Sequence, residues 1–198
     1  APAQVAALAA IADEAGMAVH MDGARFANAL VTLGCSPADL TWRAGVTMLS
    51  FGATKNGAMM AEAVVDFRPQ ADRPPHESLR RRRMRGGHLL SKMRFLSAQL
   101  LAYVEDDLWL RLAGRANAGA ARLGEGLAAL PGVRLAHPVE ANEVFVMLPP
   151  ALADALAAAD IEFHRWPGEG GMVARMVVPH SVETADIERL LACAGAAA

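Results

Sequence analysis

The sequence predicts a layered α/β domain that is followed by a smaller α+β domain. Short apolar runs alternate with helical patterns over the first 67 residues, and strand patterns become more frequent after residue 130. A long helical pattern lies between these regions, from about residue 89 to residue 130, and it is interrupted near Glu105-Asp106-Asp107. We therefore predict one domain over residues 1–104 and a second over residues 105–198.

The first region combines amphipathic helices with short apolar strands. Val5, Leu8 and Ile11 recur at helical spacing, and Gly16 follows them as a C-cap. Strands joined through helices form parallel sheets with right-handed crossovers, so we expect buried parallel strands here. The predicted elements are helices at residues 5–15 and 25–33, strands at residues 17–21, 46–51 and 62–67, and a loop at residues 68–75.

The second region has the pattern of a compact α+β domain. Pro131-Gly132 ends the long helical pattern. The elements predicted after it are strands at residues 133–136, 143–148, 161–166 and 173–178, and helices at residues 151–159 and 185–193. We expect the alanine-rich tail from Ala194 to Ala198 to fray.

Composition restricts the class of protein. The net charge is -2, whereas a dedicated nucleic-acid-binding domain is usually basic. Five arginines fall within residues 80–85; they could bind a nucleic acid or an acidic partner, but a solvated helix face or a cofactor-phosphate or subunit contact explains them better. No run reaches the roughly 20 apolar residues of a membrane span. Cys35 and Cys193 are too few for a disulfide scaffold, so we expect a cytoplasmic protein with no nucleic-acid or membrane partner.

Charged side chains follow two neighbouring predicted strands. Asp22 and Arg25 come after the first strand, and Lys55 comes after the second. Ligands of open α/β sheets bind outside the carboxyl ends of the strands, so these side chains should face one crevice. A lysine in such a place suits Schiff-base chemistry, and a carboxylate beside a pyridine nitrogen keeps that nitrogen protonated. The alternatives are that Asp22 caps the next helix and that Lys55 is an ordinary loop lysine.

Longer strings around these residues resemble the low-specificity L-threonine aldolases. Residues 20–29 (HMDGARFANA) and residues 50–57 (SFGATKNG) carry the resemblance, together with residues 87–96 (GHLLSKMRFL) and 140–145 (EANEVF). These aldolases belong to the aromatic amino acid β-eliminating lyase group of fold-type-I pyridoxal-phosphate enzymes. The resemblance implies the C-terminal part of a fold-type-I, PLP-dependent transferase-like large domain, lacking its N-terminal strands, plus a small α+β C-terminal domain.

The resemblance also implies a site for pyridoxal 5'-phosphate (PLP) and a small amino acid substrate. Lys55 would form the Schiff base with PLP, and Asp22 would pair with the pyridinium nitrogen. Arg25, which would also brace Asp22, and Arg175 would bind the substrate carboxylate, because the planar guanidinium matches a carboxylate. No metal is expected. The residues expected to reach toward the cofactor phosphate are Arg85 and Arg94.

The reaction that the resemblance implies is retro-aldol cleavage of L-threonine or L-allo-threonine to glycine and acetaldehyde. Two alternatives share the scaffold: another PLP-dependent β-eliminating lyase and a phenylserine-type aldolase. A third is an inactive fragment, since the family's N-terminal part, where we expect the general base, is missing. The apolar fraction and the family pattern favour a homodimer or homotetramer.

Overall fold

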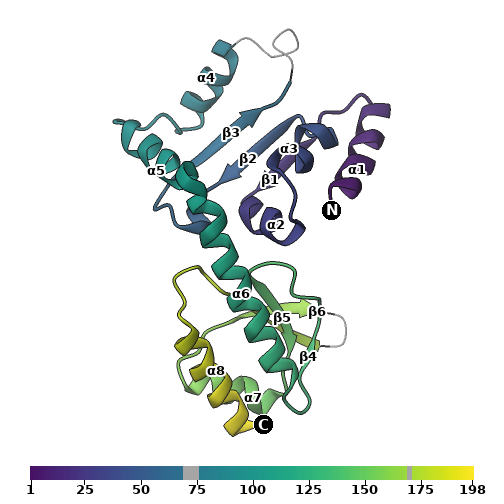
Figure 1. The fold of residues 1–198 in the computed structure, drawn as a ribbon, viewed down its shortest axis with the longest axis vertical. Coiled ribbons are helices and arrows are strands. Elements are labelled where there is room, and N and C mark those ends of the chain that lie inside the picture. Colours follow the sequence, from purple (N-terminus) through teal and green to yellow (C-terminus); the bar gives the residue numbers. More distant parts are fainter. Residues whose placement is uncertain (69–75, 169–170) are drawn as a thin grey trace. The chain divides into compact units, whose positions relative to one another are not determined.

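A computed structural model describes residues 1–68, 76–168 and 171–198. The chain divides into two compact units, Ala1–Trp109 (unit 1) and Leu110–Ala198 (unit 2), which Figure 1 traces in sequence colours. The boundary at 104/105 that the sequence predicts precedes this division at 109/110 and lies at the start of a 3-10 turn, η4 (Glu105–Asp107). Asp106 and Asp107 adopt left-handed backbone angles there, with φ of 51° and 54°, which ends the helix before them.

Unit 1 contains a sheet of three strands with β2 in the centre. Strand β1 (His20–Gly23) is parallel to β2 (Met48–Gly52), and β3 (Glu62–Asp66) is antiparallel to β2. The prediction of parallel strands is therefore wrong for β3. The reason is the connection: residues 53–61 form a 3-10 turn and irregular chain, which is too short for a parallel crossover.

The helices of unit 1 agree with the predicted positions at residues 5–15 and 25–33. Helix α2 ends at Gly34, whose φ of 60° is the left-handed conformation that glycine adopts without strain. The long helical pattern begins at Arg94 and not near residue 89, and the predicted loop at residues 68–75 lies outside the described residues except for Arg68. The helices are α1 (Pro2–Glu14), α2 (Phe26–Leu33), α3 (Pro37–Leu40), α4 (His76–Arg85) and α5 (Arg94–Val104).

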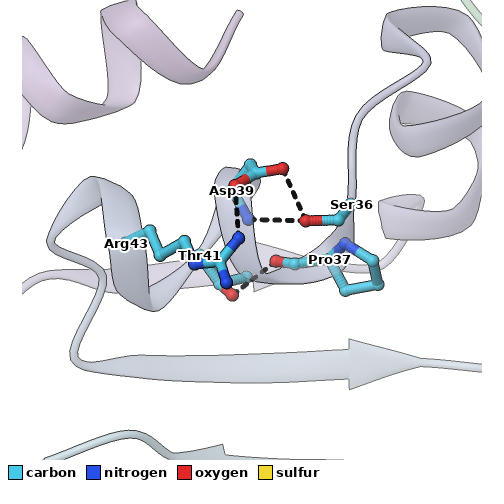
Figure 2. A network of polar contacts seen from close by, with 5 residues as sticks. All are labelled: Ser36, Pro37, Asp39, Thr41 and Arg43. Carbon is cyan, nitrogen blue, oxygen red and sulfur yellow. Dashed lines mark hydrogen bonds and ion pairs between the residues drawn. The ribbon is translucent and has the colours of Figure 1, made fainter.

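A polar network fixes the short helix α3 (Figure 2). Ser36 Oγ caps the helix by accepting a hydrogen bond of 3.2 Å from the amide of Asp39. The Asp39 carboxylate in turn accepts from Arg43 Nη1 at 2.9 Å. Thr41 closes the helix, because its Oγ1 donates to the carbonyl oxygen of Pro37 at 2.6 Å. A helix of four residues is thus stabilised by side-chain contacts rather than by its length.

Unit 2 contains a four-stranded antiparallel sheet with the order β4-β5-β7-β6. Helices from three parts of the unit pack on one face of this sheet and form a core with fully buried Leu127, Val144 and Leu156. Ala194 is fully buried and α8 continues to Ala197, so the prediction of a frayed tail is wrong. The elements are β4 (Arg134–Leu135), β5 (Glu143–Met147), β6 (His164–Gly168), β7 (Gly171–Val177), α6 (Leu108–Ala128), α7 (Pro150–Ala158) and α8 (Thr184–Ala197).

Over the described ranges, no helix combines the length and the apolar character that crossing a bilayer requires.

Candidate active site

The Asp22 turn forms the carboxyl end of β1. Asp22 Oδ1 accepts a hydrogen bond of 3.0 Å from the amide of Ala24, two residues further on, which makes this a side-chain-closed turn. Helix α2 begins after Arg25, and that N-terminus has no side-chain cap. Asp22 therefore does not cap the helix, and its carboxylate is exposed.

The Lys55 turn follows the carboxyl end of β2. Lys55 is the central residue of the 3-10 turn η2 (Thr54–Asn56), and Gly57 continues the chain with a φ of 119° that favours glycine. Thr54 Oγ1 accepts a hydrogen bond of 3.2 Å from the amide of Ala61. The Lys55 side chain is exposed and makes no hydrogen bond or ion pair with any residue that the structure describes.

The Asp22 turn lies against the end of β2, the strand that leads into the Lys55 turn. A Cβ atom added to Gly52 would be 2.7 Å from Ala24 Cα, and one added to Gly23 would be 2.6 Å from the carbonyl oxygen of Ser50. Only glycine allows such a close approach of two backbones. Because β1 and β2 are parallel, both turns leave the same edge of the sheet, as the sequence predicts for the loops that carry Asp22 and Lys55.

Polar side chains share the sheet face of Asp22. Asp22 is directly opposite Ser50 in the parallel register, and Ser50 Oγ is 2.8 Å from His20 Nε2. His20 is exposed, and on the neighbouring strand β3 Val64 is 59% exposed on the same face. This face is open in the structure, whereas Leu49 on the opposite face is buried.

An aromatic cluster supports the turns from the buried face of the sheet. It consists of Phe26, Phe51, Tyr103 and Trp109, whose ring centroids lie 5.5–6.3 Å apart in the contacting pairs. Phe51 is in β2, shortly before Lys55, and Phe26 immediately follows Arg25. The cluster therefore anchors both turns to the rest of unit 1.

The other arginines predicted for unit 1 lie at three separate places in the sequence. Arg25 is a partly exposed residue between the Asp22 turn and α2. Arg85 is the last residue of α4 and Arg94 the first of α5, and both are exposed. The Arg94 guanidinium lies 4.9 Å from the ring centroid of Phe95. Neither Arg85 nor Arg94 makes a hydrogen bond or ion pair with Asp22 or Lys55 within the described part of the chain.

Arg175 lies in unit 2, on the face of the sheet that is opposite its helices. Its Nε donates to Glu143 Oε1 at 2.8 Å, and its Nη2 bonds the same oxygen. The guanidinium also lies 5.6 Å from the ring centroid of Trp166. The side chains of Arg175 and Glu143 are only 19% and 20% exposed, so this ion pair is largely removed from water.

The Asp22 and Lys55 turns carry the two kinds of side chain that PLP requires, a carboxylate and a primary amine. An exposed primary amine can condense with an aldehyde, and an exposed carboxylate can pair with a protonated ring nitrogen. Gly52 and the fully buried Ala53 lie just before the Lys55 turn, so the backbone that leads into the turn carries no bulky side chain. Within the described ranges, no cluster of three or more His, Cys, Asp or Glu residues is suited to a metal ion.

A profile of the beta-eliminating lyase family matches residues 1–150. The chain belongs to the beta-eliminating lyase family. It is 46% identical to the low specificity L-threonine aldolase of Pseudomonas aeruginosa over 170 residues, which are 86% of this chain and 48% of that protein. It is 42% identical to the enzyme of the same name from a Pseudomonas species over 191 residues, or 96% of this chain and 54% of that protein. The chain thus spans about half the length of the curated relatives it matches.

The fold of this beta-eliminating lyase chain is also that of a solved threonine aldolase. The enzyme from Leishmania major superposes with a TM-score of 0.83 at 26% identity, over 98% of this chain and 55% of that chain. The predicted fold class, that of the fold-type-I enzymes, is confirmed.

Three contacts of this lyase chain escaped the sequence prediction. Asn56 directly follows Lys55, but its buried partners, Tyr103 and Trp109, are 47 and 53 residues away. For Glu143, the partner of Arg175, the sequence contains a signal that could have predicted the contact. Strand alternation places it on the face opposite the buried Val144, where a charged side chain needs a partner.

Proposed function

We propose that the protein to which this chain belongs is a PLP-dependent lyase that cleaves L-threonine or L-allo-threonine to glycine and acetaldehyde. The parallel pairing of β1 with β2, with Ala24 packed against Gly52, carries the proposal, because it brings the loops that bear Asp22 and Lys55 to one edge of the sheet. The relatives named low specificity L-threonine aldolase, at 42–46% identity, support the substrate class.

Lys55 and Asp22 hold the cofactor in this proposal. The Lys55 amine binds the cofactor aldehyde, and the Asp22 carboxylate keeps a proton on the ring nitrogen. When bound, PLP supplies an electron sink for the electron pair that remains on the substrate α-carbon after the Cα–Cβ bond breaks. The hydrogen bond from the Ala24 amide orients Asp22 for this task, since it occupies Oδ1 and restrains the carboxylate.

Two arginines have a proposed role in carboxylate binding, Arg25 in unit 1 and Arg175 in unit 2. Arginine has five N–H donors, and Glu143 takes two of those of Arg175, from Nε and Nη2. The remaining donors can engage a carboxylate while Glu143 keeps the guanidinium in place. Trp166 restrains the same group from the side of the ring.

Arg85 and Arg94 contribute positive charge toward the cofactor phosphate, in a protein that assembles as a homodimer or homotetramer. Exposed apolar side chains around these arginines support subunit contacts: Leu89 is 51% exposed and Phe95 is 57% exposed. We place the protein in the cytoplasm, which suits its free Cys35 and Cys193.

Reductive trapping tests the cofactor site, because Lys55 and Lys92 are the only lysines of the chain. The chain is incubated with PLP, reduced with borohydride and digested, and the two lysine peptides are quantified by mass spectrometry. We expect pyridoxyl label predominantly on Lys55, loss of that label in Lys55→Ala, and its retention in the matched control Lys92→Ala. Equal labelling of Lys55 and Lys92 contradicts the assignment.

Product assays on the protein that contains this chain distinguish the reaction from others on the same scaffold. Release of acetaldehyde from threonine supports the aldolase, whereas release of indole from tryptophan without acetaldehyde identifies a different β-eliminating lyase.

A further inference from the structure

Tyr103 lies beneath the Lys55 turn and connects its two ends. The hydroxyl accepts a hydrogen bond of 2.7 Å from Asn56 Nδ2, immediately after Lys55. It donates a longer bond of 3.5 Å to the carbonyl oxygen of Gly52, the last residue of β2. One hydroxyl group therefore links the residue that follows the lysine to the strand that precedes it.

Asn56 is held from a second direction as well. Its Nδ2 also donates to the carbonyl oxygen of Trp109 at 2.9 Å, so both amide protons are used. Asn56 and Tyr103 are each only 3% exposed. Loss of a partner in such surroundings leaves a buried polar group unsatisfied, which costs more than the hydrogen bond itself contributes. The turn is therefore strongly restricted to one conformation.

The position of the Tyr103 hydroxyl is determined by packing. Its ring contacts Phe51 of β2 at a centroid distance of 5.9 Å and Trp109 at 6.3 Å, within the aromatic cluster. Burial raises the pKa of Tyr103 above its ordinary value, which further favours the protonated hydroxyl that donates to Gly52.

We propose that Asn56 and Tyr103 are positioning residues that hold the Lys55 amine beside the Asp22 turn. This inference rests on the proposed function of Lys55. Neither residue needs to touch cofactor or substrate; they act through the backbone of η2, which sets where the exposed lysine side chain begins. Misplacement of a reacting group by about 1 Å can cost about 100-fold in rate, so a small shift of this turn is sufficient to matter.

Cleavage by a lysine-specific protease measures the turn directly, without PLP. The native chain offers that protease two bonds, after Lys55 and after Lys92. Tyr103→Phe removes the hydroxyl and leaves the sequence at both bonds unchanged. We expect cleavage after Lys55 to increase at least about fivefold relative to cleavage after Lys92, because both bonds of the hydroxyl are lost and one such bond corresponds to about fivefold.

Thr41→Val is the matched control for lost stability. Thr41 is 2% exposed and donates one part-buried hydrogen bond to the carbonyl oxygen of Pro37 in α3, in the same unit but outside the Lys55 turn (Figure 2). The ratio of cleavage after Lys55 to cleavage after Lys92 should remain at the wild-type value in this variant. If Tyr103→Phe and Thr41→Val give the same ratio, Tyr103 does not hold the turn.

Trapping with PLP and borohydride then tests the position of the amine. In Tyr103→Phe we expect the PLP concentration that half-labels Lys55 to rise about fivefold, while that for Lys92 stays constant. If PLP labels Lys55 preferentially, and to the same extent in wild type and Tyr103→Phe, the positioning role is overturned but the proposed function is not. Equal labelling of the two lysines in the wild type overturns the proposed function, and the positioning role with it, whatever the cleavage ratio.

Discussion

Tyr103 is the only tyrosine of the chain, which makes its ionisation directly observable. Burial raises its pKa above the ordinary value of 10.0, the hydrogen bond from Asn56 lowers it, and the negative charge of Glu62 raises it. The neutral phenol is thus favoured in the folded chain, as expected for a group that donates to one backbone carbonyl within an aromatic cluster.

The stability of unit 1 should therefore fall at alkaline pH. The raised pKa of the folded state contributes stability that is complete below the unfolded value of 10.0. That stability is lost as the pH rises from this value through the folded pKa, because the unfolded chain releases the proton first. Near-ultraviolet absorbance of the phenolate should give a midpoint above 10.0 in the native chain. Urea should lower that midpoint, and a native midpoint at or below the unfolded one contradicts the burial argument.

The residues of the candidate site differ in how far along the sequence their contact partners lie. Asp22 stands next to Gly23 and Lys55 two residues before Gly57, each shortly after a mostly apolar run, so their places at the ends of strands could be predicted. Asn56 could not be assigned a structural role in this way. Its side chain bonds residues 47 and 53 positions away, and no local pattern predicts which side of a turn faces the core.

The type of most elements could be predicted from the sequence, but the pairing of the strands was harder to predict. The strand expected at residues 17–21 is observed as β1 (His20–Gly23), because its register is set by β2. The amides of Thr47 and Met48 and the hydroxyl of Thr47 all donate to the carbonyl oxygen of Val19, which aligns the strands from the next residue onward. An apolar run alone does not contain this information.

The pairing of β5 with β7 leads to a prediction about Arg175 and Glu143. Arg175→Met should reduce the free energy of unfolding by about 1–3 kcal/mol, because it leaves a mostly buried carboxylate without its guanidinium. Glu143→Gln should cost less, since the glutamine oxygen still accepts the hydrogen bond from Nε. Urea unfolding of both variants at neutral pH measures the difference. If the glutamine variant is the less stable one, the ion pair does not dominate this part of the sheet.

At the scale of the whole chain, the two units offer separate reporters of unfolding. Cys35 lies in unit 1 and Cys193 in unit 2, and both thiols are free. Cys193 packs against the core of unit 2, so its labelling by a thiol reagent in urea follows the loss of that core.

Leu127→Ala should shift the Cys193 labelling transition to lower urea. Leu127 is fully buried in the unit 2 core, and replacing such a side chain by alanine costs about 2–5 kcal/mol. At a typical urea dependence this lowers the midpoint by about 1 M or more. Cys35 in the same sample provides the reference for unit 1. An unchanged Cys193 midpoint contradicts the placement of Leu127 at the centre of this core.

The sequence alone determined the class of the fold, most of its helices and the two turns that carry Asp22 and Lys55. Hydrophobic periodicity and glycine positions within a few neighbouring residues indicate these features, so a short stretch of sequence is enough to predict each of them. The tertiary structure decided that β3 runs antiparallel, that Arg175 faces Glu143, and that Tyr103 ties Asn56 to Gly52. Each of these joins segments distant in the sequence, and only the packing of the folded chain selects one such contact over its competitors.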